Sequence, residues 1–180
     1  MIHPWRDVPP GRNPPEVITA VVEIPRGSRN KYELDKESGQ MRLDRVLASA
    51  VHYPGDYGFV PRTLAEDNDP IDVLVLINEP TFPLCHIDVR PIGALRMRDR
   101  GENDEKILAV PTNDPYWAEY FDIADIAQHV LKEVEHFFAV YKDLEGKRVE
   151  ILGWEKSERA MALVSAAIKR YEATYLAVGP

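Results

Sequence analysis

The sequence has a single cysteine, fewer basic than acidic residues, and no long apolar run. Because Cys85 has no second cysteine to pair with, an internal disulfide is excluded, and the reducing cytoplasm is the expected compartment. No apolar run approaches the roughly 20 residues of a membrane-spanning helix. The first residues also lack the apolar core of a signal peptide. We therefore expect a cytoplasmic protein that has no membrane association.

The charge balance also excludes some partners. The 180 residues include 30 acidic residues against 22 Lys and Arg, which gives a net charge of −8. Nucleic-acid binding usually requires a basic face, so we expect no nucleic-acid partner. An anionic substrate is still compatible with the chain if basic residues or metal ions gather locally. The length suits one well-cored domain. We expect it to span residues 1–180, with an extended proline-rich arm at 1–15 and a tail at 172–180.

Short strand-like segments dominate the first two-thirds of the chain, and helical patterns follow. Strands are expected at 17–24, 31–34, 41–46, 71–77, 87–97, 107–110 and 148–154. Loops are expected at the aromatic segment 53–59 and at an acidic hairpin tip, 99–106. Apolar residues at three- and four-residue steps from Ile126 to Tyr141 predict a helix whose start Asp122 or Asp125 caps. A second helix is expected at 157–171. This order indicates an α+β fold with a small barrel or curled sheet, and strand order cannot be read from it.

Three carboxylates are concentrated in one short segment. Asp67, Asp69 and Asp72 lie within six residues, directly before the apolar run 73–77. Crowded carboxylates repel each other unless cations compensate, and Mg²⁺ prefers carboxylate oxygen and retained water. The segment therefore predicts a divalent-metal site at a loop-to-strand junction, and a solvated acidic turn is the alternative. An EF-hand does not fit, because its sixth and twelfth positions require Gly and Glu and are Asp72 and Asn78 here.

Charged side chains also occur inside predicted strands. Glu23 lies in an apolar strand, and Lys31 and Glu33 alternate with a tyrosine, so both can face the same side. Arg45 precedes another apolar pair. A strand face that points to water explains most residues of this kind. The alternative is a barrel mouth lined by both signs of charge, which could hold metal ions and phosphate together.

Taken together and in order, these segments resemble the family I soluble inorganic pyrophosphatases of bacterial type. The segment 67–72 fits the family signature Asp-x-Asp-Pro-apolar-Asp, and the resemblance covers about residues 14–154. The flanking matches are Glu23-Ile24-Pro25, Lys31-Tyr32-Glu33, Asp44-Arg45, Tyr53-Pro54, Asp56-Tyr57-Gly58, Asp99, Asp104-Glu105-Lys106, His136-Phe137-Phe138 and Tyr141-Lys142-Asp143-Leu144. The resemblance implies a curled five-stranded OB-type barrel with two main helices. It also implies Mg²⁺-dependent hydrolysis of pyrophosphate to two phosphates by a cytoplasmic homohexamer, with Mn²⁺ as a possible substitute.

The resemblance further implies a role for each matched residue. Asp69 would be the general base that takes a proton from the attacking water. The metal ligands would be Asp67, Asp72, Asp104, Asp99 and, through water, Glu23. The residues that bind substrate would be Lys31, Arg45, Tyr57, Lys106, Tyr141 and Lys142, with Glu33 beside them. Lys31, Arg45 and Tyr57 would join Asp69 as catalytic residues.

The charges of this set lead to a further expectation. Its seven carboxylates and four basic residues carry −3 if all are ionised, and two Mg²⁺ ions would change the sum to +1. Metal binding should therefore precede the binding of an anionic substrate. Three other functions are considered: a phosphohydrolase acting on nucleotides or polyphosphate, an OB-type module that binds single-stranded nucleic acid, and a purely structural acidic protein, for which the full set of motif matches would be a coincidence. The carboxylate-lined mouth opposes the second, and a comparison of pyrophosphate with ATP would separate the first.

Overall fold

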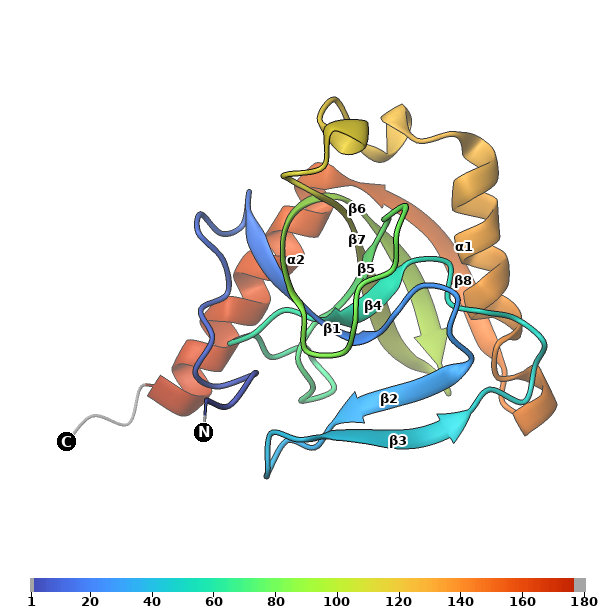
Figure 1. Cartoon of the computed structure of the whole chain (residues 1–180), viewed down its shortest axis with the longest axis horizontal. Helices are drawn as coiled ribbons and strands as arrows, with labels where there is room; N and C mark the ends of the chain where they lie inside the picture. The colour runs from blue at the N-terminus through green and yellow to red at the C-terminus, as the bar shows by residue number, and fades with distance from the viewer. Residues whose placement is uncertain (1, 177–180) are drawn as a thin grey trace.

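A computed structural model describes residues 2–176, in which five strands close into a barrel (Figure 1). In ring order these are β1 (Ile18–Ile24), β4 (Asp56–Phe59), β5 (Asp72–Val75), β7 (Glu102–Pro111) and β6 (His86–Asp99). The pairing of β1 with β6 closes the ring, and β8 (Val149–Lys156) extends the sheet beyond β6. Only β5 and β7 run parallel; the other neighbours in this sheet are antiparallel. The expected α+β fold with an OB-type barrel is confirmed.

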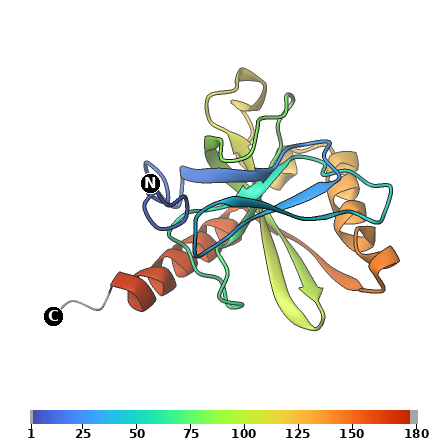
Figure 2. The same ribbon diagram turned by 60° about the horizontal axis from the view of Figure 1, so that its bottom comes forward.

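Two helices lie on opposite sides of the barrel (Figures 1 and 2). They are α1 (Gln128–Val140) and α2 (Ser157–Tyr171). Strand β5 is buried on both faces, because Val73 and Val75 pack in the cluster with α2, while Leu74, and Leu76 just after the strand, pack in the cluster with α1. Side chains alternate across a strand, so burial on both sides explains its continuous apolar run. No helix within residues 2–176 is long and apolar enough to cross a membrane.

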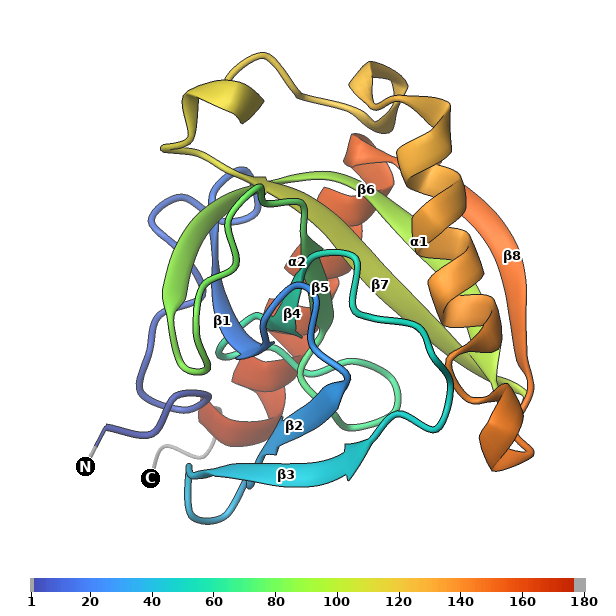
Figure 3. The same cartoon turned by 45° about the vertical axis from the view of Figure 1, so that its right-hand side comes forward.

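A separate hairpin lies beside the barrel and is joined to it through residues 25–29 and 47–55 (Figure 3). It consists of β2 (Asn30–Leu34) and β3 (Met41–Val46), and its register sets Lys31 opposite Arg45. The remaining elements are η1 (Pro115–Trp117), η2 (Ile123–Asp125), η3 (Asp143–Glu145) and the single π-helical turn η4 (Glu172–Leu176). Residues 177–180 of the expected tail lie outside the described residues.

Two segments that were predicted to be loops contain strands. The segment 53–59 includes β4, which packs so closely on β1 that a Cβ at Gly58 would lie 1.9 Å from the Val21 carbonyl oxygen. A short strand with glycine in its middle has no clear sequence pattern. The acidic tip is also shorter than predicted, because β6 and β7 extend to a turn at residues 100–101. The hydrogen bonds between β6 and β7 keep this segment in strands, although its polar composition is typical of a loop. Asp99 and Asp104 are therefore held on strands.

The predicted start of the first helix was also wrong. Helix α1 begins at Gln128, and no side chain caps it. Asp122 and Asp125 instead cap the short η2 helix reciprocally. The Asp122 carboxylate also accepts hydrogen bonds from the Ser157 backbone N–H at 3.0 Å and the Ser157 hydroxyl at 2.9 Å. The sequence pattern predicted that Asp122 or Asp125 caps α1, but in the tertiary structure the Asp122 carboxylate accepts hydrogen bonds at the start of α2.

Candidate active site

The predicted site residues, far apart in sequence, come together around one cavity of about 410 Å³. The cavity is bounded by strand β2 and the turn after it, by the barrel strands β1, β4, β5, β6 and β7, by the loop before β5, and by residues 141–142 after α1. All of the predicted site residues except Arg45 line it: Glu23, Lys31, Glu33, Tyr57, Asp67, Asp69, Asp72, Asp99, Asp104, Lys106, Tyr141 and Lys142. The charged side chains of the predicted strands at these positions therefore line a cavity and do not simply form a water-facing side of a sheet.

Lys106 lies at the centre of the charged residues. Its ammonium contacts one oxygen of Asp72 and one oxygen of Asp104, each at 2.5 Å, so these two oxygens are at most 5.0 Å apart. The parallel register aligns Asp72 with Lys106, and Asp104 precedes Lys106 by two residues on the same strand face. Burial alone would lower the pKa of Lys106, but the charges of Asp72 and Asp104 and the nearby Tyr57 raise it well above its usual value. The lysine is therefore a fixed cation.

Glu23 and Asp67 are two carboxylic acids of the cavity whose pKa values are raised. Burial raises the pKa of Glu23 to about 8, although its Oε1 accepts a hydrogen bond of 2.7 Å from the Leu34 N–H. This bond ties β1 to the hairpin, and the carboxyl group is mostly protonated at neutral pH. Burial and the charge of Asp104 raise the pKa of Asp67. Both carboxyl groups therefore ionise less readily than exposed ones do.

Asp99 and Lys142 form a second ion pair at the cavity wall. The lysine Nζ lies 2.5 Å from Oδ2 of Asp99. The other oxygen, Oδ1, is buried, and it has no hydrogen-bond partner among residues 2–176. A buried carboxylate oxygen without a partner is costly. Because a carboxylate oxygen is also a preferred ligand of hard cations, this atom is available to a metal ion.

Asp69 lines the cavity with a side chain that is about half exposed, and it has a partner that sequence reasoning missed. Its carboxylate pairs with Lys36, which lies in the turn between β2 and β3. The Asp69 N–H donates to Asp67 Oδ1 at 3.0 Å, which links the two acids of the loop. The turn composition around Lys36 gave no sign of this role, because only the fold brings that turn to the loop.

Arg45 is the predicted residue that does not line the cavity. Its guanidinium pairs with Asp44 at 2.5 Å and with Glu145 at 2.8 Å. Burial alone would lower the pKa of Arg45, but Glu145 and Asp44 raise it. In the hairpin register Arg45 lies opposite Lys31. Its guanidinium is occupied by ion pairs with two carboxylates and does not line the cavity.

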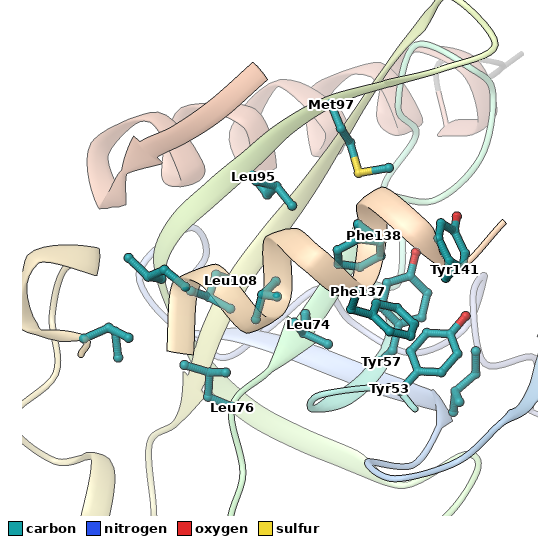
Figure 4. Close-up of a cluster of buried hydrophobic side chains, with 14 of the residues drawn as sticks. Tyr53, Tyr57, Leu74, Leu76, Leu95, Met97, Leu108, Phe137, Phe138 and Tyr141 are labelled. Carbon is teal, nitrogen blue, oxygen red and sulfur yellow. The ribbon is translucent and has the colours of Figure 1, made fainter. Parts of the chain in front are cut away.

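The buried cluster in Figure 4 contains several aromatic rings, two of which, Tyr57 and Tyr141, also line the cavity. The ring centroids of Tyr53 and Phe137 are 4.6 Å apart, those of Phe137 and Tyr141 are 5.3 Å apart, and those of Tyr57 and Phe138 are 6.1 Å apart. Burial raises the pKa of Tyr57 well above its usual value, so its phenol remains a neutral hydrogen-bond donor. Rigid packing of this kind holds the hydroxyl groups of Tyr57 and Tyr141 in place.

The donor set fits a hard divalent cation. Among residues 2–176, no group of three or more His, Cys, Asp and Glu side chains is arranged to hold a metal ion by itself. Mg²⁺ does not require such a cage, because it usually keeps several waters and takes one or two carboxylates together with substrate phosphates. Oxygen ligands that line one cavity, one of them buried and unpaired, match that preference.

Comparisons with known proteins agree with this geometry. The family model described as inorganic pyrophosphatase matches residues 20–172. The chain is 49% identical to an inorganic pyrophosphatase of Haloferax volcanii, over 97% of this chain and 99% of the relative. It is 53% identical to one from Nostoc sp., over 91% of this chain and 96% of the relative.

Solved structures show the same likeness. The crystal structure of inorganic pyrophosphatase from Thermus thermophilus has a TM-score of 0.89 and 45% identity, and the match covers 92% of this chain and 97% of that one. A type I inorganic pyrophosphatase from Toxoplasma gondii has a TM-score of 0.87 at 25% identity, covering 96% of this chain and 88% of that one. The resemblance seen in the sequence is confirmed. The chain belongs to the inorganic pyrophosphatase family, whose members are hydrolases of a phosphoanhydride bond.

Proposed function

We propose that this chain hydrolyses inorganic pyrophosphate to two orthophosphates, with Mg²⁺ as its cofactor and Asp69 as the general base. The observation that supports this most directly is the composition of the cavity wall, where seven carboxylates and four lysines face one volume of about 410 Å³. Carboxylates suit divalent cations, and lysines suit phosphate oxygens. A small, highly charged anion that carries its own metal ions requires both.

Charge explains why a cofactor is needed. With Glu23 mostly protonated, the other six carboxylates and the four lysines give the cavity lining a net charge of −2 at neutral pH, and it would repel pyrophosphate. The proposed ligands are Asp67, Asp72, Asp99 and Asp104, with Glu23 acting through water. When bound, divalent cations supply positive charge and a more acidic water near neutral pH. Mn²⁺ fits the same oxygen ligands and is a possible substitute.

The side chains of the protein carry out the remaining steps. Asp69 accepts the proton of the attacking water as the water oxygen bonds to one phosphorus atom and the bond from that atom to the bridging oxygen breaks. Lys106 and Lys142 offset the negative charge that develops on the phosphate oxygens. The neutral phenols of Tyr57 and Tyr141 donate hydrogen bonds. Lys31 and Arg45 bind the second phosphate, with Glu33 holding Lys31, and Arg45 must release an acid to do so.

A phosphate-release assay tests this function. With pyrophosphate and Mg²⁺ we expect rapid release of two phosphates for each substrate molecule. Without a divalent cation we expect almost none. ATP and polyphosphate serve as comparison substrates, because a general phosphohydrolase would use them as well. Equal rates with ATP and pyrophosphate, or full activity in a chelator, would contradict the proposal.

The proposal includes the assembly and the compartment that the resemblance implies. We expect a homohexamer in the cytoplasm, with pyrophosphate and phosphate as the small-molecule partners and with no nucleic-acid or membrane partner. Size-exclusion chromatography with light scattering measures the mass directly. A monomer at micromolar concentration would contradict the hexamer without affecting the proposed reaction.

A further inference from the structure

Residues 3–7, here called the N-terminal segment, are docked on the body of the protein near the cavity. Trp5 is only 3% exposed and packs with Leu64 and Tyr171, and its indole N–H donates to the Thr63 carbonyl at 3.0 Å. This dark-blue segment lies near the turn of the β2–β3 hairpin in both Figure 1 and Figure 3. The segment therefore has a buried anchor and lies between two elements that carry proposed site residues.

The first of these elements is the hairpin turn. Arg6 Nη2 donates to the Lys36 carbonyl at 2.9 Å, and His3 Nε2 lies 3.2 Å from the same oxygen. His3 Nδ1 accepts the N–H groups of Trp5 and Arg6, so its ring proton is on Nε2 and is donated to Lys36. A Cβ on Gly39 would lie 3.0 Å from the His3 ring. The turn is thus held at its tip by two side chains of the segment.

The second element is the loop that leads to Asp67 and Asp69. Arg62 in this loop has a left-handed backbone, with φ of 50°, which is unfavourable for a residue with a side chain. Three bonds hold it: its N–H donates to Trp5 O at 2.9 Å, its Nε to Arg6 O at 2.9 Å, and its Nη2 to Asp7 O at 3.1 Å. The N-terminal segment therefore stabilises a strained point of the loop.

The hairpin turn and the loop meet again at the cavity, where the Lys36 ammonium contacts the Asp69 carboxylate. We propose that Arg6 and His3 are positioning residues for the reaction: by fixing the Lys36 backbone against the loop, they hold Lys36 on Asp69 and so orient the base. This inference rests on the proposed function, because it assigns a structural support to the proposed general base. Neither Arg6 nor His3 lines the cavity.

A double-mutant cycle tests the proposal. We expect Arg6→Ala to lower kcat about three- to tenfold with little change in KM, since small misplacements of a catalytic group can cost up to about 10²-fold. Lys36→Ala should lower kcat similarly. The Lys36 carbonyl is still present in Lys36→Ala, so adding Arg6→Ala to it should produce no further loss in kcat if both act through the same contact. Arg6→Lys, which keeps a donor, should restore part of the rate.

The matched control is Arg12→Ala. Arg12 is also an arginine of the N-terminal region, but it is 78% exposed, pairs with Asp88 at 2.8 Å and does not line the cavity. We expect its kcat to equal that of the wild type. Losses from Arg6→Ala and Lys36→Ala that multiply in the double variant would overturn the proposal, and so would an unchanged kcat in either single variant. Wild-type protein that does not release phosphate from pyrophosphate would instead refute the proposed function.

Discussion

Removal of the Lys106 ammonium tests the electrostatic description of the site. In Lys106→Met, Asp72 and Asp104 lose their shared cation and face each other. Breaking a buried ion pair by removing one partner costs about 3–5 kcal/mol. The Lys106 side chain is 7% exposed, but those of Asp72 and Asp104 are 29% and 17% exposed. Solvent screening reduces the cost, and we expect the free energy of unfolding at pH 7 without divalent cations to fall by about 2–3 kcal/mol.

Mg²⁺ should reverse most of this loss. Once the ammonium is gone, two carboxylates whose contacting oxygens are at most 5.0 Å apart have no cation, and a divalent ion can replace it. The measurement is urea unfolding, followed by tryptophan fluorescence at one fixed protein concentration, in EDTA and in saturating Mg²⁺. We expect the urea midpoint of Lys106→Met to rise with Mg²⁺ by about 1 M more than that of the wild type.

Lys36→Met is the matched control, because Lys36 also pairs with an aspartate, Asp69, but both side chains are about half exposed. Exposed pairs contribute about 0–1 kcal/mol, so this variant should lose less than 1 kcal/mol. Equal losses for the two lysine variants would refute the claim that burial makes the Lys106 contacts strong. A Lys106→Met protein as stable in EDTA as the wild type would refute it as well.

Four further predictions concern single residues. Asp69→Asn should bind Mg²⁺ and pyrophosphate but lose about 10²–10⁴-fold in kcat; calorimetry and phosphate release check both halves, and near-normal turnover would remove Asp69 as the base. Asp72→Ala should raise the Mg²⁺ concentration needed for half-maximal rate, whereas an unchanged metal titration would exclude a ligand role. Asp122→Ala should lower the unfolding free energy by about 1–2 kcal/mol at pH 7 in urea titrations. Burial alone would raise the pKa of Asp122, but the N–H groups of Ser157 and Ala124 lower it below 3.8, so this stabilisation is present above pH 3.8 and is lost as the pH falls through the lower folded value; a gap between wild type and variant that does not narrow as the pH is lowered would contradict the assignment. Gly58→Ala should cost about 3 kcal/mol or more, because its Cβ would lie 1.9 Å from a backbone oxygen of β1; calorimetric melting checks this, and an unchanged Tm would mean that the strands separate easily.

Much of the fold could be predicted from local patterns. Apolar residues at helical spacing identified α2, and alternation or β-branched runs identified β1, β2 and β3, because these periods follow from backbone geometry. The short strand β4 was missed, since its glycine and aromatic residues are typical of a loop. The cap of α1 was wrong because Asp122 is used by η2 and by Ser157, which lies 35 residues along the chain.

The candidate site likewise has residues that the sequence predicted and contacts that it could not predict. The ordered resemblance to a known family predicted the acids, the lysines and the tyrosines of the site, and carboxylate oxygens and fixed cations suit the proposed reaction. The sequence could not predict that Lys36 would meet Asp69, or that Arg45 would be engaged by Glu145, 100 residues away. Such contacts depend on which surfaces of the hairpin, the loop and η3 face each other.

The sequence by itself determined the class of fold, the family and the set of chemical groups, because composition, periodicity and motif order are properties of the chain. Only the tertiary structure decided which carboxylate each lysine neutralises, which acid is protonated near neutral pH, and what holds the two sides of the cavity together. The physical reason is that pKa values and ion pairs depend on distance and burial, and the fold sets both by bringing seven separate segments to one cavity.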